Sequence, residues 1–136
     1  MASDPPSEHI AIRCDLFEVR KLAEWLKARC RDAELSPEVL IELELALVEA
    51  ANNIVEHGGL GPDDTIRFGC RITPDSVAMT LSDRGSPHPG DLYANPHAAP
   101  LDATRSRGVA VILACVDDVH YVRHDGWNLF TLTKRL

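Results

Sequence analysis

The sequence predicts an α+β domain in which helices cover a mixed, mainly antiparallel sheet, that is, a two-layer α/β sandwich. Two observations lead to this fold class. Helical and strand periodicities follow one another in the order strand, helix, helix, strand, strand, loop, helix, strand, strand. The later strands come in consecutive pairs joined by short turns, which is typical of antiparallel hairpins and not of a doubly wound parallel sheet.

The first strand and helix follow from local patterns. Residues 9–14 alternate apolar and polar side chains and predict a strand. Asp15 is expected to cap a helix over residues 16–31. The side chains expected to face inward from this helix are Leu16, Val19, Leu22, Ala23 and Leu26.

The central helix is predicted over residues 37–57. Ser36 is expected as its N-cap and Pro37 as its first residue, and the helix should end at the Gly58-Gly59 pair. One inward face carries Leu40, Leu43, Leu47, Ala50, Ala51 and Ile54. Further apolar residues, namely Ile41, Leu45, Val48 and Val55, predict that most of the helix is buried.

A narrow polar stripe remains on this helix and contains Glu42, Glu49, Asn53 and Glu56. Glu49 and Asn53 are one helical turn apart, so their side chains are neighbours. A carboxylate and an amide oxygen in this arrangement can hold a hard cation or orient a hydroxyl group. The alternative interpretation is that the stripe is the solvated face of the helix.

The second half of the chain contains two predicted hairpins separated by a long loop. Residues 65–72 and 76–82 form the first hairpin, with Ile66, Phe68, Cys70 and Ile72 inward. Residues 83–107 lack periodicity and are interpreted as a functional lid. A short helix over 108–116 and strands over 119–123 and 127–135 complete the fold.

Length, charge and cysteine usage limit the class of protein. A chain of 136 residues with 45% hydrophobic residues fits a flexible tail over 1–8 and a single domain over 9–136. The net charge of −7 argues against direct nucleic-acid binding and against an anionic membrane surface. No apolar run could span a bilayer and no signal peptide is recognisable, so we expect a cytoplasmic protein. The scattered cysteines are expected to be reduced core residues.

Asp83 and Gly85 mark a candidate binding turn at the end of a strand. A carboxylate there can accept a hydrogen bond from the exocyclic amine of adenine. Gly85 permits a sharp turn and a close approach of a ring to the backbone. The alternative interpretation is an ordinary turn, because Asp and Gly are common in turns.

A second candidate is the segment Arg105-Ser106-Arg107-Gly108, which is predicted to lead into the short helix. Free backbone N–H groups and the helix dipole favour phosphate at such a position. The segment does not match the P-loop pattern, and no dinucleotide-binding glycine motif follows the first strand.

The order of these motifs is more informative than each motif alone. Glu49-Ala50-Ala51-Asn52-Asn53-Ile54-Val55-Glu56-His57-Gly58 is followed by Asp83-Arg84-Gly85-Ser86-Pro87, then by Arg107-Gly108 and by Gly126-Trp127-Asn128-Leu129. In this order the chain resembles the GHKL (Bergerat-fold) ATPases, and among them the anti-sigma factor serine/threonine protein kinases of bacterial partner-switching systems. The resemblance extends over residues 10–136.

The resemblance implies a Bergerat (histidine kinase-like ATPase) fold that binds ATP and Mg²⁺. By this resemblance Asn53 binds the Mg²⁺ that bridges the ATP phosphates, and Glu49 is the catalytic base. Asp83 reads adenine with Gly85 beside it. The phosphate-binding segment is Arg105, Ser106, Arg107 and Gly108.

The resemblance also implies partners. The substrate would be a serine or threonine of a STAS-domain anti-sigma factor antagonist, and the same surface would hold a sigma factor or another output protein. Similar kinases can form homodimers. Ser106 stands where the family pattern usually has glycine, so a non-catalytic, nucleotide-dependent binding module remains an alternative, and a free ATPase is a third hypothesis.

Overall fold

The computed structural model describes residues 8–88, 93 and 103–136, and its elements follow the predicted order. In chain order they are β1 (Glu8–Arg13), α1 (Leu16–Asp32), α2 (Pro37–His57), β2 (Thr65–Ile72), β3 (Ser76–Asp83), α3 (Ala103–Cys115), β4 (Asp118–His124) and β5 (Trp127–Arg135). The predicted α+β class is confirmed. Residues 1–7 of the predicted tail lie outside the described residues.

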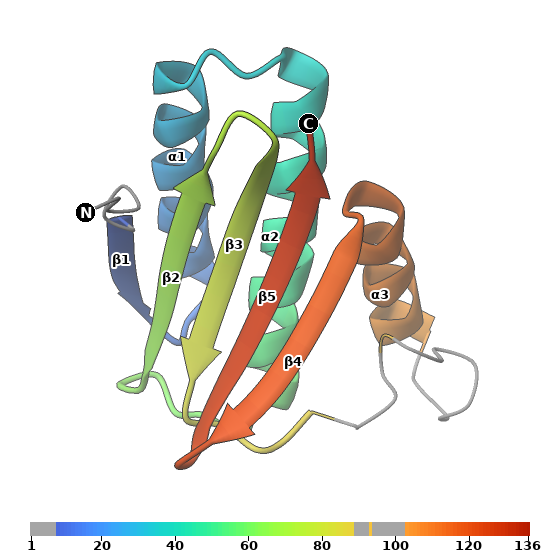
Figure 1. The fold of residues 1–136 in the computed structure, drawn as a ribbon. Helices are drawn as coiled ribbons and strands as arrows, with labels where there is room; N and C mark the ends of the chain where they lie inside the picture. The colour runs from blue at the N-terminus through green and yellow to red at the C-terminus, as the bar shows by residue number, and fades with distance from the viewer. Residues whose placement is uncertain (1–7, 89–92, 94–102) are drawn as a thin grey trace.

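The five strands form one sheet in the order β1-β2-β3-β5-β4 (Figure 1). The sheet was expected to be mixed and mainly antiparallel, and all four pairings between the described strands are antiparallel. The registers place inward residues opposite each other, as in the row Ile10, Phe68, Leu81 and Phe130. Because side chains alternate along a strand, these pairings gather the apolar side chains on one face.

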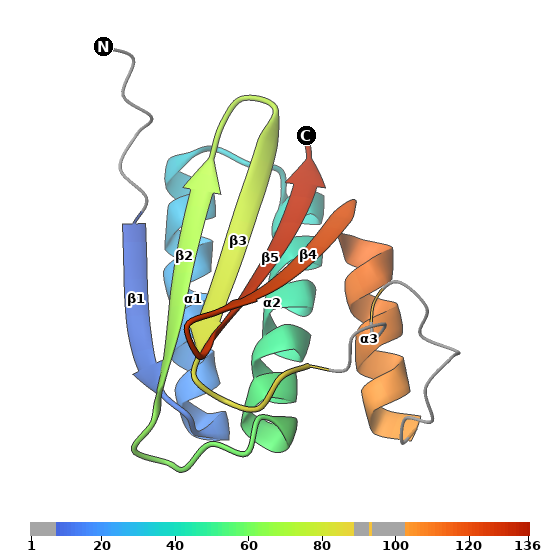
Figure 2. The same ribbon diagram turned by 60° about the horizontal axis from the view of Figure 1, so that its bottom comes forward.

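The three helices pack against that face and form the second layer (Figures 1 and 2). α2 lies between α1 and α3, with α3 near the β4 edge. The largest side chains of the core are fully buried, among them Leu22, Leu26, Leu43, Leu47, Phe68 and Phe130. Burial of this apolar surface is the main force that holds the two layers together.

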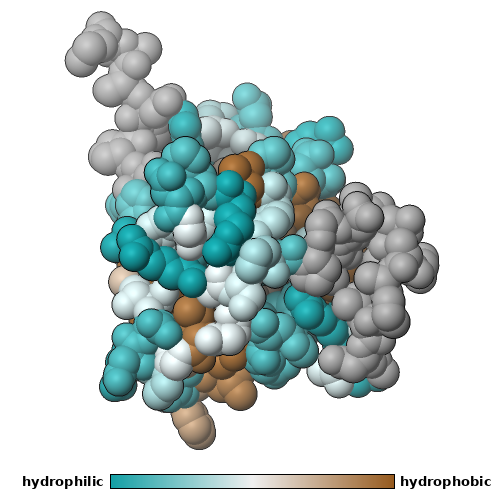
Figure 3. All heavy atoms as spheres, turned by 90° about the horizontal axis from the view of Figure 1, so that it is seen from below, coloured by the Kyte–Doolittle hydropathy of each residue, from teal (hydrophilic) through white to brown (hydrophobic). Residues whose placement is uncertain are grey.

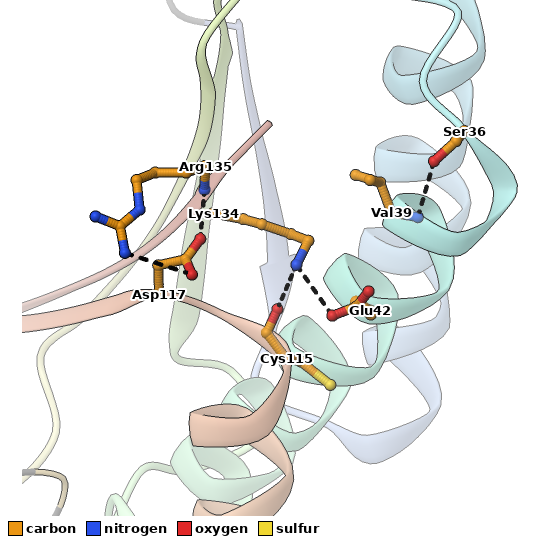
Figure 4. Close-up of polar contacts among 7 residues, drawn as sticks. All are labelled: Ser36, Val39, Glu42, Cys115, Asp117, Lys134 and Arg135. Atoms are coloured by element: carbon orange, nitrogen blue, oxygen red, sulfur yellow. Dashed lines mark hydrogen bonds and ion pairs between the residues drawn. The ribbon is translucent and has the colours of Figure 1, made fainter.

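Both long helices begin at the predicted caps. The Asp15 carboxylate accepts a hydrogen bond from the Phe17 backbone N–H at 2.8 Å, and the Ser36 hydroxyl accepts one from the Val39 N–H at 3.3 Å (Figure 4). Each satisfies a donor that the first turn of a helix leaves unpaired. α2 ends at His57 with Gly58 as its C-cap, and Gly59 has the left-handed conformation, with φ of 69°.

Some side chains predicted to be buried are exposed instead. Leu16, Ile41 and Leu45 are between 48% and 57% exposed. Ile41 and Leu45 are one turn apart on α2, and no described element covers that side of the helix, because α1, α3 and the sheet occupy its other sides. The prediction that most of α2 is buried is therefore wrong for the stripe that carries Ile41 and Leu45.

α3 begins at Ala103, five residues before the predicted start at Gly108. Arg105, Ser106 and Arg107 consequently lie within the helix and not in a loop before it. The buried side chains of Val109 and Ile112 anchor the helix to the core, and alanine and arginine favour its extension toward the N-terminus. Most of the predicted lid, residues 89–92 and 94–102, lies outside the described residues.

Lys134 joins the end of the sheet to two helices (Figure 4). Its Nζ donates hydrogen bonds to the Glu42 carboxylate of α2 at 3.0 Å and to the Cys115 carbonyl at the end of α3 at 3.2 Å. Asp117 accepts a hydrogen bond from the Arg135 backbone N–H at 2.6 Å. These contacts hold α2, α3 and β5 in a defined relation, which matters because α2 and α3 carry candidate site residues.

All four cysteines are buried and unpaired, as predicted for reduced core residues. Over the described residues, no helix is both long and apolar enough to cross a bilayer.

Candidate nucleotide-binding site

The C-terminal end of α2 meets the turn that follows β3. The Ser86 backbone N–H donates a hydrogen bond to the Gly58 carbonyl at 2.8 Å. A Cβ atom at position 85 would lie 2.5 Å from that same carbonyl oxygen, so glycine is required for this approach. Gly85 thus has a steric role in bringing the Asp83 turn against the helix that carries Asn53.

Asp83 is a buried acid with hydrogen-bond partners on one side only. The side chain is 1% exposed. Its Oδ1 accepts hydrogen bonds from the Gly85 N–H at 2.7 Å and from Asn128 Nδ2 at 3.0 Å. Its Oδ2 is buried and has no partner among the described residues. Because an unsatisfied buried acceptor is costly, this oxygen points to a ligand that donates a hydrogen bond.

Asn128 connects this turn to the sheet. Its amide nitrogen also donates hydrogen bonds to the carbonyls of Gly85 at 3.2 Å and Ser86 at 3.0 Å. Its Oδ1 accepts one from the Tyr121 hydroxyl at 2.6 Å and one from the Arg123 guanidinium at 2.9 Å. The Asn128 side chain is fully buried and its polar atoms are all paired, so it holds the turn in one shape.

The sequence interpretation assigned no role to Asn128, Tyr121 or Arg123. One signal could have identified the first of them. Side chains alternate between the two faces of a strand, so Asn128 lies on the same inward face as Phe130 and Leu132. The alternation in β5 therefore predicts that this polar side chain is buried. A buried amide needs polar partners, which the turn after β3 supplies.

Aromatic side chains pack above the turn. The His88 ring stacks on Phe130 with centroids 5.7 Å apart and also contacts Tyr121 at 4.8 Å. Tyr93 packs on the same Phe130 at 4.7 Å. Burial lowers the pKa of His88 and raises the pKa of Tyr93 to about 12, so both rings are neutral near pH 7.

Asn53 and Asp83 line one narrow cavity. Its wall also includes Ile54, His57, Gly58, Ser86, Pro87, His88 and Arg105. The volume is about 10 Å³, which is room for about one water molecule. The structure therefore brings residues from α2, from the turn after β3 and from α3 together, in a conformation too closed to admit an adenine ring.

A wider cavity of about 150 Å³ adjoins the first and shares Asn53, His57 and Arg105 with it. Glu49 and Gly108 line this second cavity, with Asn52, Glu56 and Thr104. Of the predicted phosphate segment, Arg105 and Gly108 thus reach the site. Ser106 and Arg107 are exposed on α3 and line neither cavity.

Tyr93 contacts the predicted metal-binding residue directly. Asn53 Nδ2 donates a hydrogen bond to the Tyr93 hydroxyl at 3.3 Å. The amide nitrogen of Asn53 is therefore engaged, while its oxygen is the atom that a hard cation would use. Tyr93 is a site residue that the sequence interpretation missed, because it lies within the aperiodic loop.

The donor set fits a nucleotide with Mg²⁺ better than a metal held by protein alone. No group of three or more His, Cys, Asp or Glu side chains suited to a metal ion occurs among the described residues. Mg²⁺ keeps several waters and uses few protein ligands, so the oxygen of Asn53 together with phosphates is sufficient. Figure 3 views the end of the molecule where α2 and β3 finish, and many of the described residues on this face are hydrophilic, with hydrophobic residues between them.

Comparison with known proteins identifies the domain family over almost the whole chain. Residues 12–134 match the model of the histidine kinase-like ATPase domain. The serine/threonine-protein kinase BtrW of Bordetella bronchiseptica is 30% identical over 114 residues, which cover 81% of this chain and 80% of that protein.

Solved structures share the fold at lower identity. The RsbU and RsbW domains of a Mycobacterium tuberculosis protein give a TM-score of 0.71 at 20% identity, over 97% of this chain and 33% of that chain. This chain thus spans about a third of that solved chain. The SiaB–SiaC complex of Pseudomonas aeruginosa gives a TM-score of 0.63 at 12% identity, over 95% and 89% of the two chains. With the family match and the kinase relative, these findings show that the chain belongs to the histidine kinase-like ATPase domain family.

Proposed function

We propose that this chain is an ATP-dependent serine/threonine protein kinase and anti-sigma-type regulator. The observation that carries the proposal is the convergence of Glu49, Asn53 and Asp83 on two adjoining cavities. The relationship to a serine/threonine-protein kinase supports the same reaction class. In this proposal the protein acts in the cytoplasm.

Each part of the site has a task in nucleotide binding. The Oδ2 of Asp83 accepts a hydrogen bond from the exocyclic amine of adenine, and the hydrogen bond from Asn128 to Oδ1 holds the carboxylate in position. Asn53 offers its amide oxygen to Mg²⁺, and Arg105 lies beside it for the phosphates. When Mg²⁺ is bound, it would neutralise part of the negative charge of the phosphates.

Glu49 is proposed as the general base. It lies one turn from Asn53 and lines the wider cavity, where the phosphate end of the nucleotide would be. Its carboxylate accepts the proton of the substrate hydroxyl while the hydroxyl oxygen bonds to the γ-phosphorus. The bond between that phosphorus and the β–γ bridging oxygen breaks, which gives ADP and a phosphorylated serine or threonine.

The proposed substrate is a STAS-domain anti-sigma factor antagonist, and the proposed alternate partner is a sigma factor or another output protein. The similar fold of SiaB was solved in a complex with SiaC, which supports a role in protein association for this fold. A homodimer is a further proposed state of the chain.

The test is phosphate transfer from radiolabelled ATP with Mg²⁺ to a STAS-domain protein from the same genome. Glu49→Ala is expected to abolish transfer and to leave nucleotide binding intact. Glu38→Ala is the matched control, because Glu38 lies in the first turn of the same helix and is exposed. Transfer that persists in Glu49→Ala would remove Glu49 from the role of base.

A second candidate function is a non-catalytic, nucleotide-dependent binding module that sequesters an output protein. The observation in its favour is the small volume of the cavity that Asn53 and Asp83 line, together with the hydrogen bond from Asn53 to the Tyr93 hydroxyl. Two measurements together distinguish the two functions. Calorimetry measures the binding of ATP and ADP with and without Mg²⁺, and the transfer assay measures phosphorylation of the STAS-domain protein. Mg²⁺-dependent binding of both nucleotides without transfer or hydrolysis would favour the binding module, and hydrolysis without a partner would favour a free ATPase.

A further inference from the structure

Gly108 occupies a position where its backbone gives no reason for glycine. It lies within α3 (Ala103–Cys115), and its φ is not positive, in contrast to Gly59 and Gly126. Glycine is among the least favourable residues in a helix interior, because it loses the most conformational freedom. A glycine at this position therefore calls for a steric explanation.

The Glu49 carboxylate occupies the space that a side chain at position 108 would need. A Cβ atom there would lie 2.7 Å from Glu49 Oε2 and 3.7 Å from Glu49 Cδ. Cβ atoms in proteins do not approach other heavy atoms to less than 3.0 Å, so one of the two groups would have to move. Among the described residues, and apart from its own helix backbone and chain neighbours, this carboxylate is the group that a Cβ would meet within 4 Å.

The surrounding contacts determine which group would move. α3 is anchored by the buried side chains of Val109 and Ile112, and Lys134 ties its C-terminal end to Glu42 of α2. The backbones of the two helices are therefore held in place. The carboxylate is the far end of a flexible side chain, so a methyl group at position 108 would displace the carboxylate and leave the fold intact.

We propose that Gly108 is a positioning residue for Glu49, and that its missing side chain creates the space in which the base is held. The catalytic part of this inference rests on the proposed kinase function. It differs from the role that the sequence resemblance implies, in which Gly108 contacts phosphate. The two roles predict different losses, because a phosphate contact affects nucleotide affinity and the position of the base affects only transfer.

The first experiment measures both quantities in Gly108→Ala. We expect the transfer rate to fall about 10²-fold, the effect of a small misplacement of a reacting group, while the affinity for Mg²⁺-ADP stays within about twofold. Gly61→Ala is the matched control, because the added methyl group would lie 3.6 Å from the nearest atom, an ordinary contact outside the site. An unchanged transfer rate, or a loss confined to nucleotide affinity, would overturn the proposal.

The second experiment does not depend on kinase activity. Gly108→Ala is introduced into wild type, Glu49→Gln and Glu49→Ala, and the Tm of each protein is measured by thermal unfolding. In Glu49→Ala the space is empty, so the alanine should raise the Tm by about 3–5 °C through helix propensity. In wild type and Glu49→Gln, which keep the size of the side chain, the gain should be clearly smaller.

Equal gains in the three backgrounds would contradict the steric contact. If the contact is found but wild type transfers no phosphate to any STAS-domain protein, the proposed function fails and the packing of Gly108 against Glu49 stands. The two failures are therefore distinguishable.

Discussion

Asn128 Nδ2 lies 3.0 Å from Oδ1 of Asp83, and these two buried side chains come from neighbouring strands of the sheet. The Gly85 N–H donates to the same oxygen, so both protein donors are used on one side of the carboxylate. The other oxygen is buried without a partner among the described residues. This one-sided arrangement orients the acid and keeps one acceptor available for a ligand.

Replacing Asp83 by asparagine should weaken adenine nucleotide binding. Oδ2 would become an amide nitrogen, which donates and would face the donating amine of adenine. The expected loss is about 1–3 kcal/mol, the usual cost of an unsatisfied buried group, measured by calorimetry with ADP. Asp75→Asn is the control, because Asp75 is exposed in the turn at the other end of β3. Unchanged affinity would remove Asp83 from the site.

Replacing Asn128 by alanine should destabilise the fold. The substitution removes the donor to Asp83 and to the carbonyls of Gly85 and Ser86. A loss of about 1–3 kcal/mol in the free energy of unfolding is expected for buried groups left unsatisfied, measured by urea denaturation. Asn52→Ala, at a partly exposed position of α2, should change stability far less. Equal effects of the two substitutions would show that the Asn128 network is not stabilising.

Lys134→Met should lower stability by about 1–2 kcal/mol, because the charged hydrogen bonds to Glu42 and to the Cys115 carbonyl would be lost. The Lys134 side chain is only 14% exposed, so water does not readily replace these contacts. Lys21→Met is the control, since Lys21 is exposed and its ion pair with Glu18 is screened by water, so its loss should matter much less. Denaturation of both variants at the same pH gives the comparison, and a larger loss in Lys21→Met would contradict this assignment.

Stability should depend on pH through His88. Burial lowers the pKa of His88 in the folded protein, although Asp83 raises it in part and Arg105 and Arg123 lower it further. Between the folded pKa and the unfolded value near 6.5, the unfolded state binds more protons. The contribution of His88 to stability is therefore complete above the unfolded pKa and falls as the pH decreases toward the folded pKa.

The measurement for His88 is the free energy of unfolding from about pH 5 to 7.5, across the unfolded histidine pKa. His88→Gln should give a shallower dependence than wild type, with a difference in slope of at most about 1.4 kcal/mol per pH unit, the value for one proton. His124→Gln is the control, because His124 is exposed in the β4–β5 hairpin. Identical profiles for wild type and His88→Gln would contradict the effect of burial.

Several parts of the fold were predictable because they depend on near neighbours in the chain. The caps Asp15 and Ser36 each bond to a backbone N–H two or three residues away, so a short stretch of sequence suffices to predict them. The inward faces of α2 and of the first hairpin follow from regular periodicity. The exposed residues Ile41 and Leu45 were mispredicted because exposure depends on which elements pack around α2.

The helix start at Ala103 shows the same limit. The sequence around Arg105 is compatible with both a loop and a helix, and packing of Val109 and Ile112 against the core favours the helix. As a result, Arg105 and Gly108 face the cavities from a helix, while Ser106 and Arg107 point elsewhere. The binding roles predicted for these residues stay predictions that the experiments above address.

Residue types and their local spacing were enough to predict the order of the elements, their caps and the motifs that mark a family. The three-dimensional fold was needed to see that Asn128 holds Asp83, that Tyr93 contacts Asn53 and that Gly108 leaves room for Glu49. These pairs are separated by 40 or more residues along the chain. Their contacts arise from the pairing of β3 with β5, from the packing of α2 against α3 and from the contact of Tyr93 with α2, and no local pattern in the sequence encodes contacts between residues so far apart in the chain.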